Sequence, residues 1–358
     1  MIGRLDRYVS RMFLSSWFVS FVFFIGLYSV YVVFSNVDAL VKDVGETEVE
    51  FSAVLRMYLL TAPSMVTRMA PFLMVVAVLI TVMRLQRHNE LAAMVMVGRS
   101  PRRVMRPVIA LTGVFLIGLV LMQEFVAPKV AVERERLKAQ LVDHRDDWII
   151  ELTVARDPEG RMFIATDYNV EKKTIRKLGV SYTDERGNDV TVAGSNAAWA
   201  GSTSGWRLAD GVISVRTPDG NTTEEPAAFV GRSVRPQDLL VAHLEPFDMS
   251  YANLLDLARR YPNHTRYRML RHYHVTFPLA VLMLVFLALH FVLQRDPALR
   301  LRGLGLSILS CLGFLMLDAA MLSLGTSDTL PPVLAAWLPV IVAGSLVVVM
   351  YDSEESEG

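Results

Sequence analysis

The residues of this chain that could do chemistry form no catalytic or metal-binding motif. Gly98-Arg99-Ser100-Pro101 lacks the spacing and the lysine of a phosphate-binding loop. No His-Glu-x-x-His occurs, and the single cysteine, Cys311, excludes both a zinc cluster of several cysteines and an internal disulfide. His272 and His274 are two residues apart, so they would point to different sides of a helix. The sequence therefore predicts no cofactor and no enzyme activity, and any work must be driven by a partner or an ion gradient.

Few ionisable residues stand inside the long apolar segments, where charge is costly and usually faces a cavity or a partner; among them are Arg68, His290 and Asp318. Arg68 precedes Arg84 by 16 residues, which is about 24 Å along a helix. It can be a ligand-binding residue, or an arginine that snorkels or pairs with another helix. We expect Asp318 to accept a hydrogen bond between helices and His290 to reach towards the interface.

A second candidate is a short link of about residues 85–99, which contains an amphipathic stretch. Asn89 can cap a helix, and Glu90 then lies in its first turn, where the helix dipole favours a carboxylate. Leu91 and Met94 are spaced to share one face, and Gly98 ends the helix. This helix either rests on a membrane surface or docks into a groove on a partner.

Six long apolar segments must carry these residues. They cover 12–36, 53–83, 104–126, 275–293, 303–324 and 333–350. Each approaches or exceeds the roughly 20 residues that cross a bilayer as a helix. The composition is 53% hydrophobic, with a mean hydropathy of +0.36. Two soluble domains are excluded because the apolar runs lack the polar stripe of a surface helix.

Arginines in the short loops predict the orientation of the six spans. They cluster at the N-terminus (Arg4, Arg7, Arg11), between spans 2 and 3, and between spans 4 and 5. Because cytoplasmic loops are enriched in Lys and Arg, both termini are predicted to be cytoplasmic. The net charge indicates no particular class of partner, since 36 basic residues balance 36 acidic ones. The long segment between spans 3 and 4 then lies outside, in a periplasm-like space.

Residues 129–250 change to short alternating runs separated by turn signals. Examples are 148–154, 161–165, 178–182, 190–193 and 211–215. This pattern predicts an all-β sandwich or jelly roll, entered through a helix at about 131–145. Such a domain can bury a ligand between its sheets, offer an edge strand to another β protein, or act as a spacer. The chain thus divides into 1–128, 129–250 and 251–358.

Several motifs, in order, resemble the permease family of lipopolysaccharide export, of the LptF/LptG type. They are Leu5-Asp6-Arg7-Tyr8, Asn89 to Ala93 with Gly98 to Arg103, Ala193 to Trp199 with Trp206-Arg207-Leu208, Pro236 to Leu239, Met249 to Leu254, Phe277 to Ala280, and Leu330 to Pro332 with Ala336 to Pro339. Together they span essentially the whole chain. The resemblance implies an α+β membrane protein of six transmembrane helices, three plus three, with a periplasmic jelly-roll-like domain between helices 3 and 4.

The resemblance also implies partners and roles. The chain would pair with a second LptF/LptG-type permease in the bacterial inner membrane. A cytoplasmic ABC ATPase dimer would power the pair, coupled through Glu90, Leu91, Met94 and Gly98. Lipopolysaccharide or a similar anionic lipid would pass to a periplasmic β-jelly-roll bridge protein. Such a lipid needs positive charge at outer-leaflet depth, for which the candidates are Lys42, Arg68, Arg266, Arg268 and Arg271.

Two other functions compete with this one. The chain can be a mechanically coupled exporter subunit of another class, although that kind has four spans rather than six. It can also be a membrane-anchored sensor or assembly factor whose β domain only binds a partner. The sensor function does not require Glu90. Co-purification with an ATPase would distinguish the lipid-export permease from the sensor.

Overall fold

The computed structural model describes residues 3–35, 51–141, 148–157, 159–219, 221–262, 264–293 and 300–356. The chain forms two compact units. The helical unit comprises 1–37, 62–126 and 268–358, and the sheet unit comprises 38–61 and 127–267. Two long helices, α3 and α9, continue across the division.

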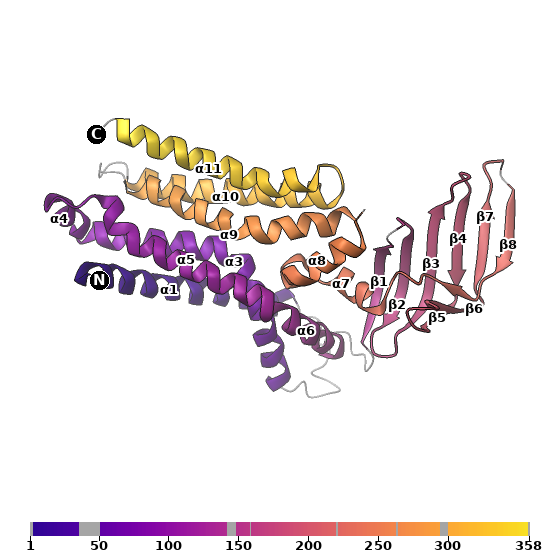
Figure 1. The fold of residues 1–358 in the computed structure, drawn as a ribbon. Coiled ribbons are helices and arrows are strands. Elements are labelled where there is room, and N and C mark those ends of the chain that lie inside the picture. The colour runs from indigo at the N-terminus through magenta and orange to yellow at the C-terminus, as the bar shows by residue number, and fades with distance from the viewer. Residues whose placement is uncertain are drawn as a thin grey trace. The chain divides into compact units, whose positions relative to one another are not determined.

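Within the described residues, six helices are long and apolar enough to cross a membrane, which confirms the six predicted spans (Figure 1). They are α1 (Arg4–Ser35), α3 (Phe51–Arg87), α5 (Pro101–Phe125), α9 (Thr265–Val292), α10 (Arg300–Thr326) and α11 (Pro332–Ser356). A seven-residue helix, α4 (Glu90–Met96), joins α3 to α5. Three long helices precede the sheet in the chain and three follow it, as predicted.

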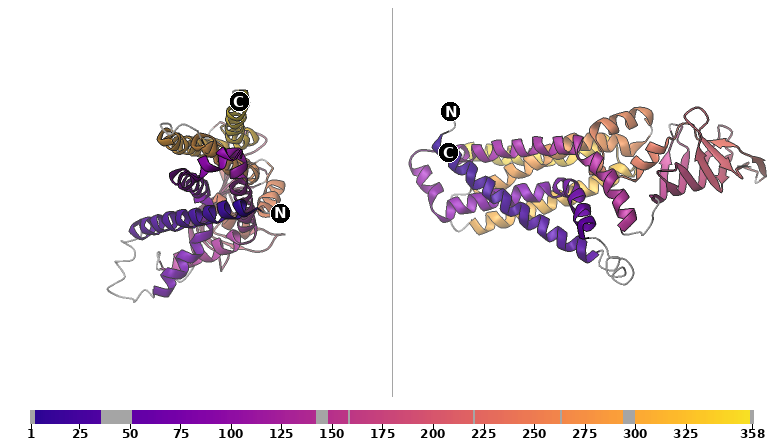
Figure 2. Two further views of the ribbon diagram at one scale, coloured as in Figure 1. Left: turned by 90° about the vertical axis from the view of Figure 1, so that its left-hand side faces the viewer. Right: turned by 90° about the horizontal axis from the view of Figure 1, so that it is seen from below.

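The six helices differ in how much of their apolar surface the protein itself covers. In the most apolar stretches of α3 and α9, 67% and 56% of residues are buried, compared with 17% in α1 and 11% in α10. Figures 1 and 2 show α10 and α11 running side by side as a hairpin. On α1, buried Val9 and Phe13 lie on the face that meets α5, where the Phe13 and Phe115 rings are 6.3 Å apart. Thus α3 and α9 are central to the helical unit, and α1 and α10 leave most of their apolar surface uncovered by the protein.

Some polar groups inside the helical unit have hydrogen-bond partners on neighbouring helices. The Tyr273 hydroxyl of α9 donates to Asp318 Oδ2 of α10 at 2.6 Å. Asp318 is therefore the interhelical acceptor that the sequence predicted. The Gln86 amide of α3 donates to the Val292 carbonyl of α9 at 2.7 Å. His290 lies beside Tyr351 of α11, with 5.7 Å between the rings.

The sheet unit is an antiparallel meander of nine described strands. They are β1 (Ile149–Arg156), β2 (Met162–Asn169), β3 (Thr174–Thr183), β4 (Asp189–Gly194), β5 (Asn196–Trp199), β6 (Trp206–Ala209), β7 (Val212–Arg216), β8 (Thr222–Pro226) and β9 (Phe229–Val230). The alternating runs of the sequence correspond to β1, β2, β3, β4 and β7. The family motif at 193–199 ends in β5, and β5 pairs with β6, which contains the motif at 206–208.

Three strands of the sheet are each interrupted and form two pieces: β4 with β5, β6 with β7, and β8 with β9. One edge of β3 pairs with β4 over Leu178 to Thr183 and with β5 over Thr174 and Ile175, so β4 and β5 continue one another. In the same way β6 leads into β7 and β8 into β9. When the two pieces of each interrupted strand are counted as one, every described strand pairs with the next strand in the sequence. The described strands therefore lack the Greek-key crossings of a jelly roll. The jelly-roll detail of the prediction is therefore not confirmed.

The folded-over ends enclose an apolar cluster centred on Trp206, which is fully buried. Its ring lies against Tyr168 and Trp199, with centroids 6.1 and 5.3 Å away. Burial raises the pKa of the Tyr168 hydroxyl to about 12. The Trp206 indole donates to the Val234 carbonyl at 2.9 Å, which satisfies its only polar atom.

In the sequence, helices precede and follow the strands of the sheet unit. α6 (Ala127–Leu141) leads into β1, and α7 (Pro236–His243), the 3₁₀ turn η2 (Pro246–Asp248) and α8 (Tyr251–Arg260) lead out of β9. The predicted helix at about 131–145 corresponds to α6. Buried Arg134 of α6 and Asp248 of η2 form an ion pair at 2.8 Å, which joins the entering and leaving segments.

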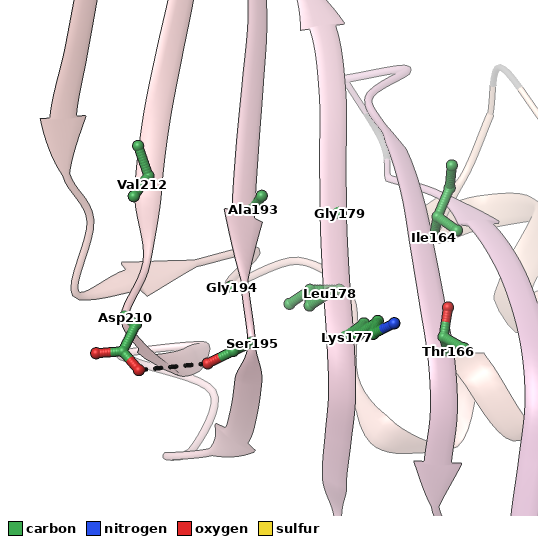
Figure 3. Close-up of a pocket in the computed structure, with 10 residues that line it drawn as sticks. All are labelled: Ile164, Thr166, Lys177, Leu178, Gly179, Ala193, Gly194, Ser195, Asp210 and Val212. Carbon is green, nitrogen blue, oxygen red and sulfur yellow. Dashed lines mark hydrogen bonds between the residues drawn. The ribbon is translucent and has the colours of Figure 1, made fainter.

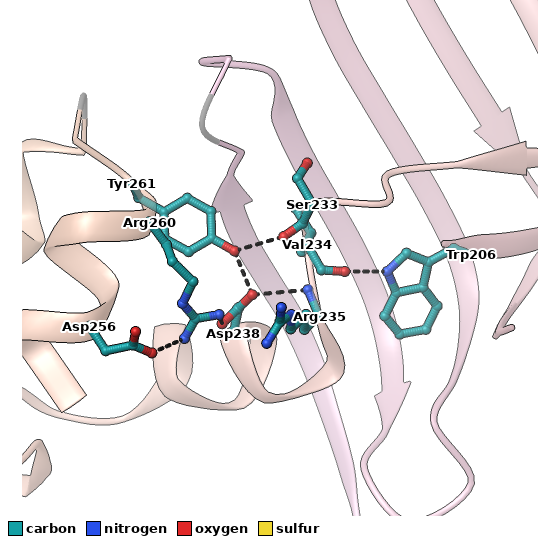
Figure 4. Close-up of polar contacts among 8 residues, drawn as sticks. All are labelled: Trp206, Ser233, Val234, Arg235, Asp238, Asp256, Arg260 and Tyr261. Carbon is teal, nitrogen blue, oxygen red and sulfur yellow. Dashed lines mark hydrogen bonds and ion pairs between the residues drawn. The ribbon is translucent and has the colours of Figure 1, made fainter. Parts of the chain in front are cut away.

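A second polar network ties α7 to α8 (Figure 4). Asp238 accepts hydrogen bonds from the backbone N–H of Arg235 and from the Arg260 guanidinium, each at 3.0 Å, and from the Tyr261 hydroxyl. Burial, followed by the bond to Asp238, raises the pKa of Tyr261. The carboxylate thus caps α7 and holds the end of α8 at the same point.

Candidate functional site

The short link between α3 and α5 is shaped by backbone geometry at both ends of α4. Asn89, at the N-cap position, adopts a left-handed conformation with φ of 56°, which asparagine tolerates better than most residues. Its side chain makes no capping hydrogen bond, so the predicted Asn89 cap is wrong in that respect. The first turn of α4 therefore depends on other contacts for its orientation.

The C-terminus of α4 ends as the sequence predicts. Gly98 has φ of +84°, and its N–H donates to the Val95 carbonyl at 2.9 Å, while the Arg99 N–H donates to Met94 at 3.2 Å. These two bonds form a Schellman motif, which requires the left-handed residue that glycine supplies. Ser100 then caps α5 by accepting the Arg103 N–H at 3.4 Å.

The apolar residues of α4 divide into an anchor and an exposed tip. Leu91 is buried, and Met94 is half-buried. Met96 and Val97 are 82% and 84% exposed. The sequence singled out Leu91 and Met94 by their spacing and missed the tip, whose signal is the run of apolar residues directly before Gly98.

Glu90 contacts a residue far away in the sequence. The Tyr8 hydroxyl of α1 lies 2.9 Å from Glu90 Oε1 and 2.8 Å from Oε2. Tyr8 belongs to the motif Leu5-Asp6-Arg7-Tyr8, which the sequence offered only as part of a family resemblance. The carboxylate is half-buried and keeps acceptor sites that the phenol does not occupy.

The cationic candidates for lipid binding lie in different places. Lys42 falls outside the described residues. Arg68 is exposed on α3 in the helical unit. On α9, Arg268 is exposed and Arg271 is half-buried, and with His272 they share one face at i, i+3 and i+4 spacing. The Arg271 Nη2 and His272 Nε2 atoms are 3.4 Å apart.

Arg266 differs from the other arginines because it is engaged by the sheet unit. Its guanidinium donates to the Leu244 carbonyl at 3.2 Å. Burial, together with the charges of Arg266 and Arg156, lowers the pKa of His264 to about 4, so this imidazole is neutral at pH 7. His264 stacks on Tyr267, with ring centroids 4.4 Å apart. Of the α9 arginines, Arg268 and Arg271 therefore form the accessible pair.

An open hollow of about 510 Å³ lies on the sheet along strands β2, β3, β4 and β7 (Figure 3). Small residues in its centre, Gly179 and Ala193, lie between the larger Ile164 and Val212 along one row across the paired strands. Lys177 and Asp210 also line it (Figure 3). The arrangement offers an apolar strip with charged groups beside it.

Comparison with known proteins identifies the family. The model of the family described as lipopolysaccharide export system permease LptF/LptG matches residues 7–352. A comparison with curated proteins finds no match. The family match covers nearly the whole chain, including all six long helices, the α4 link and the sheet. The chain therefore belongs to the LptF/LptG family of lipopolysaccharide export permeases.

Proposed function

We propose that this chain is one permease half of an ATP-driven exporter, coupled to a cytoplasmic ABC ATPase dimer through α4. The observation that carries the proposal is the exposed tip, Met96 and the C-cap residue Val97, at the end of the short helix that Glu90 begins. A partner groove that covers the tip would remove apolar surface from water, and a cationic partner residue could bind the carboxylate. Leu91 would anchor α4 from the inside, and Gly98 would permit the turn after it.

The charge distribution supports the orientation that this proposal needs. Arginines flank α4 and the N-terminus, and the positive-inside rule then places both on the cytoplasmic side. The sheet unit, inserted between the third and fourth spans, would lie in the periplasm of a bacterial inner-membrane protein. There it would pass lipid to a bridge protein of similar β structure.

A second LptF/LptG-type permease is the proposed membrane partner. The helices that the protein covers least are α1 and α10, the first and fifth spans. Exposed apolar residues along them include Phe18, Val22 and Phe23 on α1 and Leu309, Leu312 and Met316 on α10. We propose that these faces meet their counterparts on the partner and enclose a lipid cavity between the two chains.

The test of coupling is Glu90→Ala in the permease pair with its ATPase, reconstituted in vesicles that contain lipopolysaccharide. Loss of a charged partner at an interface typically costs more than tenfold in the interaction, so we expect lipid release to fall at least about tenfold. ATP hydrolysis should continue, and the folded yield should be unchanged. His88→Ala, exposed in the preceding turn, is the control. Normal lipid release by the Glu90 variant would favour the sensor or assembly-factor function instead.

The proposed cargo is lipopolysaccharide or a similar anionic lipid, bound through its phosphates by Lys42, Arg68, Arg266, Arg268 and Arg271. Charge-assisted hydrogen bonds to phosphate are roughly twice as strong as neutral ones. Arg268 and Arg271 are the accessible α9 pair, whereas Arg266 already donates to Leu244.

A photo-crosslinking amino acid at position 268 or 68 should capture lipopolysaccharide in the working complex. Position 99 is the control, because Arg99 is also exposed and cationic but belongs to the proposed cytoplasmic link. Capture of protein alone at 68 and 268, with normal transport by Arg68→Ala and Arg268→Ala, would show that these arginines are structural.

A further inference from the structure

The orientation of Glu90 has little support from α4 itself. The helix has seven residues, and only Leu91 among them is buried. Its N-terminus has no side-chain cap, since Asn89 contributes only its left-handed backbone. A helix this short is not stable on its own, so its position depends on tertiary contacts.

The contact that reaches Glu90 comes from the firmly held beginning of α1. Asp6 caps this helix by accepting the Gly3 N–H at 2.9 Å. The fully buried Val9 and Phe13 then fix the next two turns. Tyr8, next to Val9, carries its hydroxyl to within 2.9 Å of both oxygens of Glu90, across 82 residues of sequence.

We propose that Tyr8 is a positioning residue that holds the Glu90 carboxylate in place for the ATPase and transmits the movement of α4 to α1. This inference rests on the proposed coupling function of α4. The chemistry of the contact fits such a role. A phenol donates one hydrogen bond without neutralising the carboxylate, as an arginine or lysine would. An ionised carboxylate has about four acceptor sites, so a cationic partner residue can bind Glu90 while Tyr8 remains attached.

The contact gives α1 a direct link to α4 in addition to the covalent path through α3. α1 also packs on α5, the helix that follows α4. A displacement of α4 by the ATPase would therefore pull on α1 through Tyr8 as well as on α5 through the chain. Since α1 is one of the two least covered spans, its movement would directly change the contacts with a partner permease or a lipid.

The experiment compares Tyr8→Phe with the unchanged protein in the full permease pair and ATPase, reconstituted with lipopolysaccharide. Phenylalanine keeps the ring and removes only the hydroxyl. We expect unchanged assembly and an unchanged KM for ATP, but about threefold to tenfold less lipid released per ATP hydrolysed, in line with the loss of one ordinary hydrogen bond, since this contact is exposed to solvent. Replacing Tyr8 by p-aminophenylalanine, which restores a donor on the same ring, should recover most of the loss. Tyr31→Phe removes an exposed hydroxyl from the same helix and is the matched control.

The outcomes separate this inference from the function on which it rests. If Glu90→Ala is defective but Tyr8→Phe transports normally, the coupling role of α4 stands and the role of Tyr8 is refuted. If both variants transport normally, both proposals fail. Poor assembly of Tyr8→Phe, or no recovery with p-aminophenylalanine, would make Tyr8 a packing residue. In a Glu90→Ala background, Tyr8→Phe should cause no further loss, and an additive loss would contradict the inference.

Discussion

Replacing Arg134 by methionine is expected to loosen the junction between α6 and η2 by about 3–5 kcal/mol. Arg134 is bound to Asp248, whose side chain is fully buried, with 2.8 Å between Nη2 and Oδ2. Burial alone would lower the pKa of Arg134, but the charge of Asp248 and its hydrogen bond raise it. Removal of one member leaves a buried charge without its ion-pair partner, which is the costly case.

Hydrogen exchange measured by mass spectrometry on the intact protein in nanodiscs tests this expectation. Peptides from 127–141 and 246–260 should exchange roughly two to four orders of magnitude faster in Arg134→Met, while peptides from α10 and α11 should not change. The double variant Arg134→Met with Asp248→Leu should recover much of the protection, because both charges are then gone.

A neighbouring ion pair supplies the control. Arg136 of α6 binds Glu171 at 2.9 Å, but the two side chains are 51% and 44% exposed. Exposed pairs are worth about 0–1 kcal/mol, so Arg136→Met should change exchange by less than about fivefold. An equal effect of the two variants would mean that burial of the Arg134 pair does not determine the stability of this junction.

Much of the helical architecture was predictable from the sequence, because a bilayer imposes a minimum apolar length on any helix that crosses it. The ends were less predictable. α1 begins at Arg4, eight residues before the apolar run at 12, since its basic first turns are helical as well. Hydropathy locates the part of a helix that lies in lipid and says nothing of helical turns beyond it.

In the sheet, the alternation of apolar and polar residues predicted the strands that have one buried face. It did not predict the edge strand β8. All five residues of β8 are exposed, and Glu224, Glu225 and Pro226 give no alternating pattern. Only pairing with β7 makes this segment a strand. Charges and proline of this kind are typical of edge strands that avoid further pairing.

The candidate coupling site shows the same limit at the level of single residues. Spacing identified the apolar face of α4 but could not tell whether that face meets the protein or a partner, and Leu91 faces inward. The contact between Tyr8 and Glu90 depends on how α1 packs beside α4, which no local pattern encodes. The exposed Met96 and Val97 were visible only as apolar residues before a glycine.

α10 packs closely against the end of α9 at Gly303. A Cβ atom at this position would lie 2.2 Å from the carbonyl oxygen of Phe291, a backbone atom that cannot rotate away. One turn later, the Ser307 hydroxyl donates to the Gly303 carbonyl at 2.8 Å and lies 3.3 Å from the carbonyl of Ala288. Small residues let membrane helices approach in this way, because packing rather than the hydrophobic effect holds them together in lipid.

Gly303→Ala is therefore expected to force α9 and α10 apart and to destabilise the helical unit by at least the ~1–3 kcal/mol typical of overpacking. Gly305→Ala, two residues along the same helix, is the matched control, because a Cβ there meets no atom within 4 Å. In a helix, that exchange by itself favours alanine by up to about 1 kcal/mol. Unfolding of the purified protein by a graded shift from mild detergent to sodium dodecyl sulfate should show opposite displacements for the two variants. Equal midpoints would mean that the approach of α10 to Phe291 does not limit the packing of these spans.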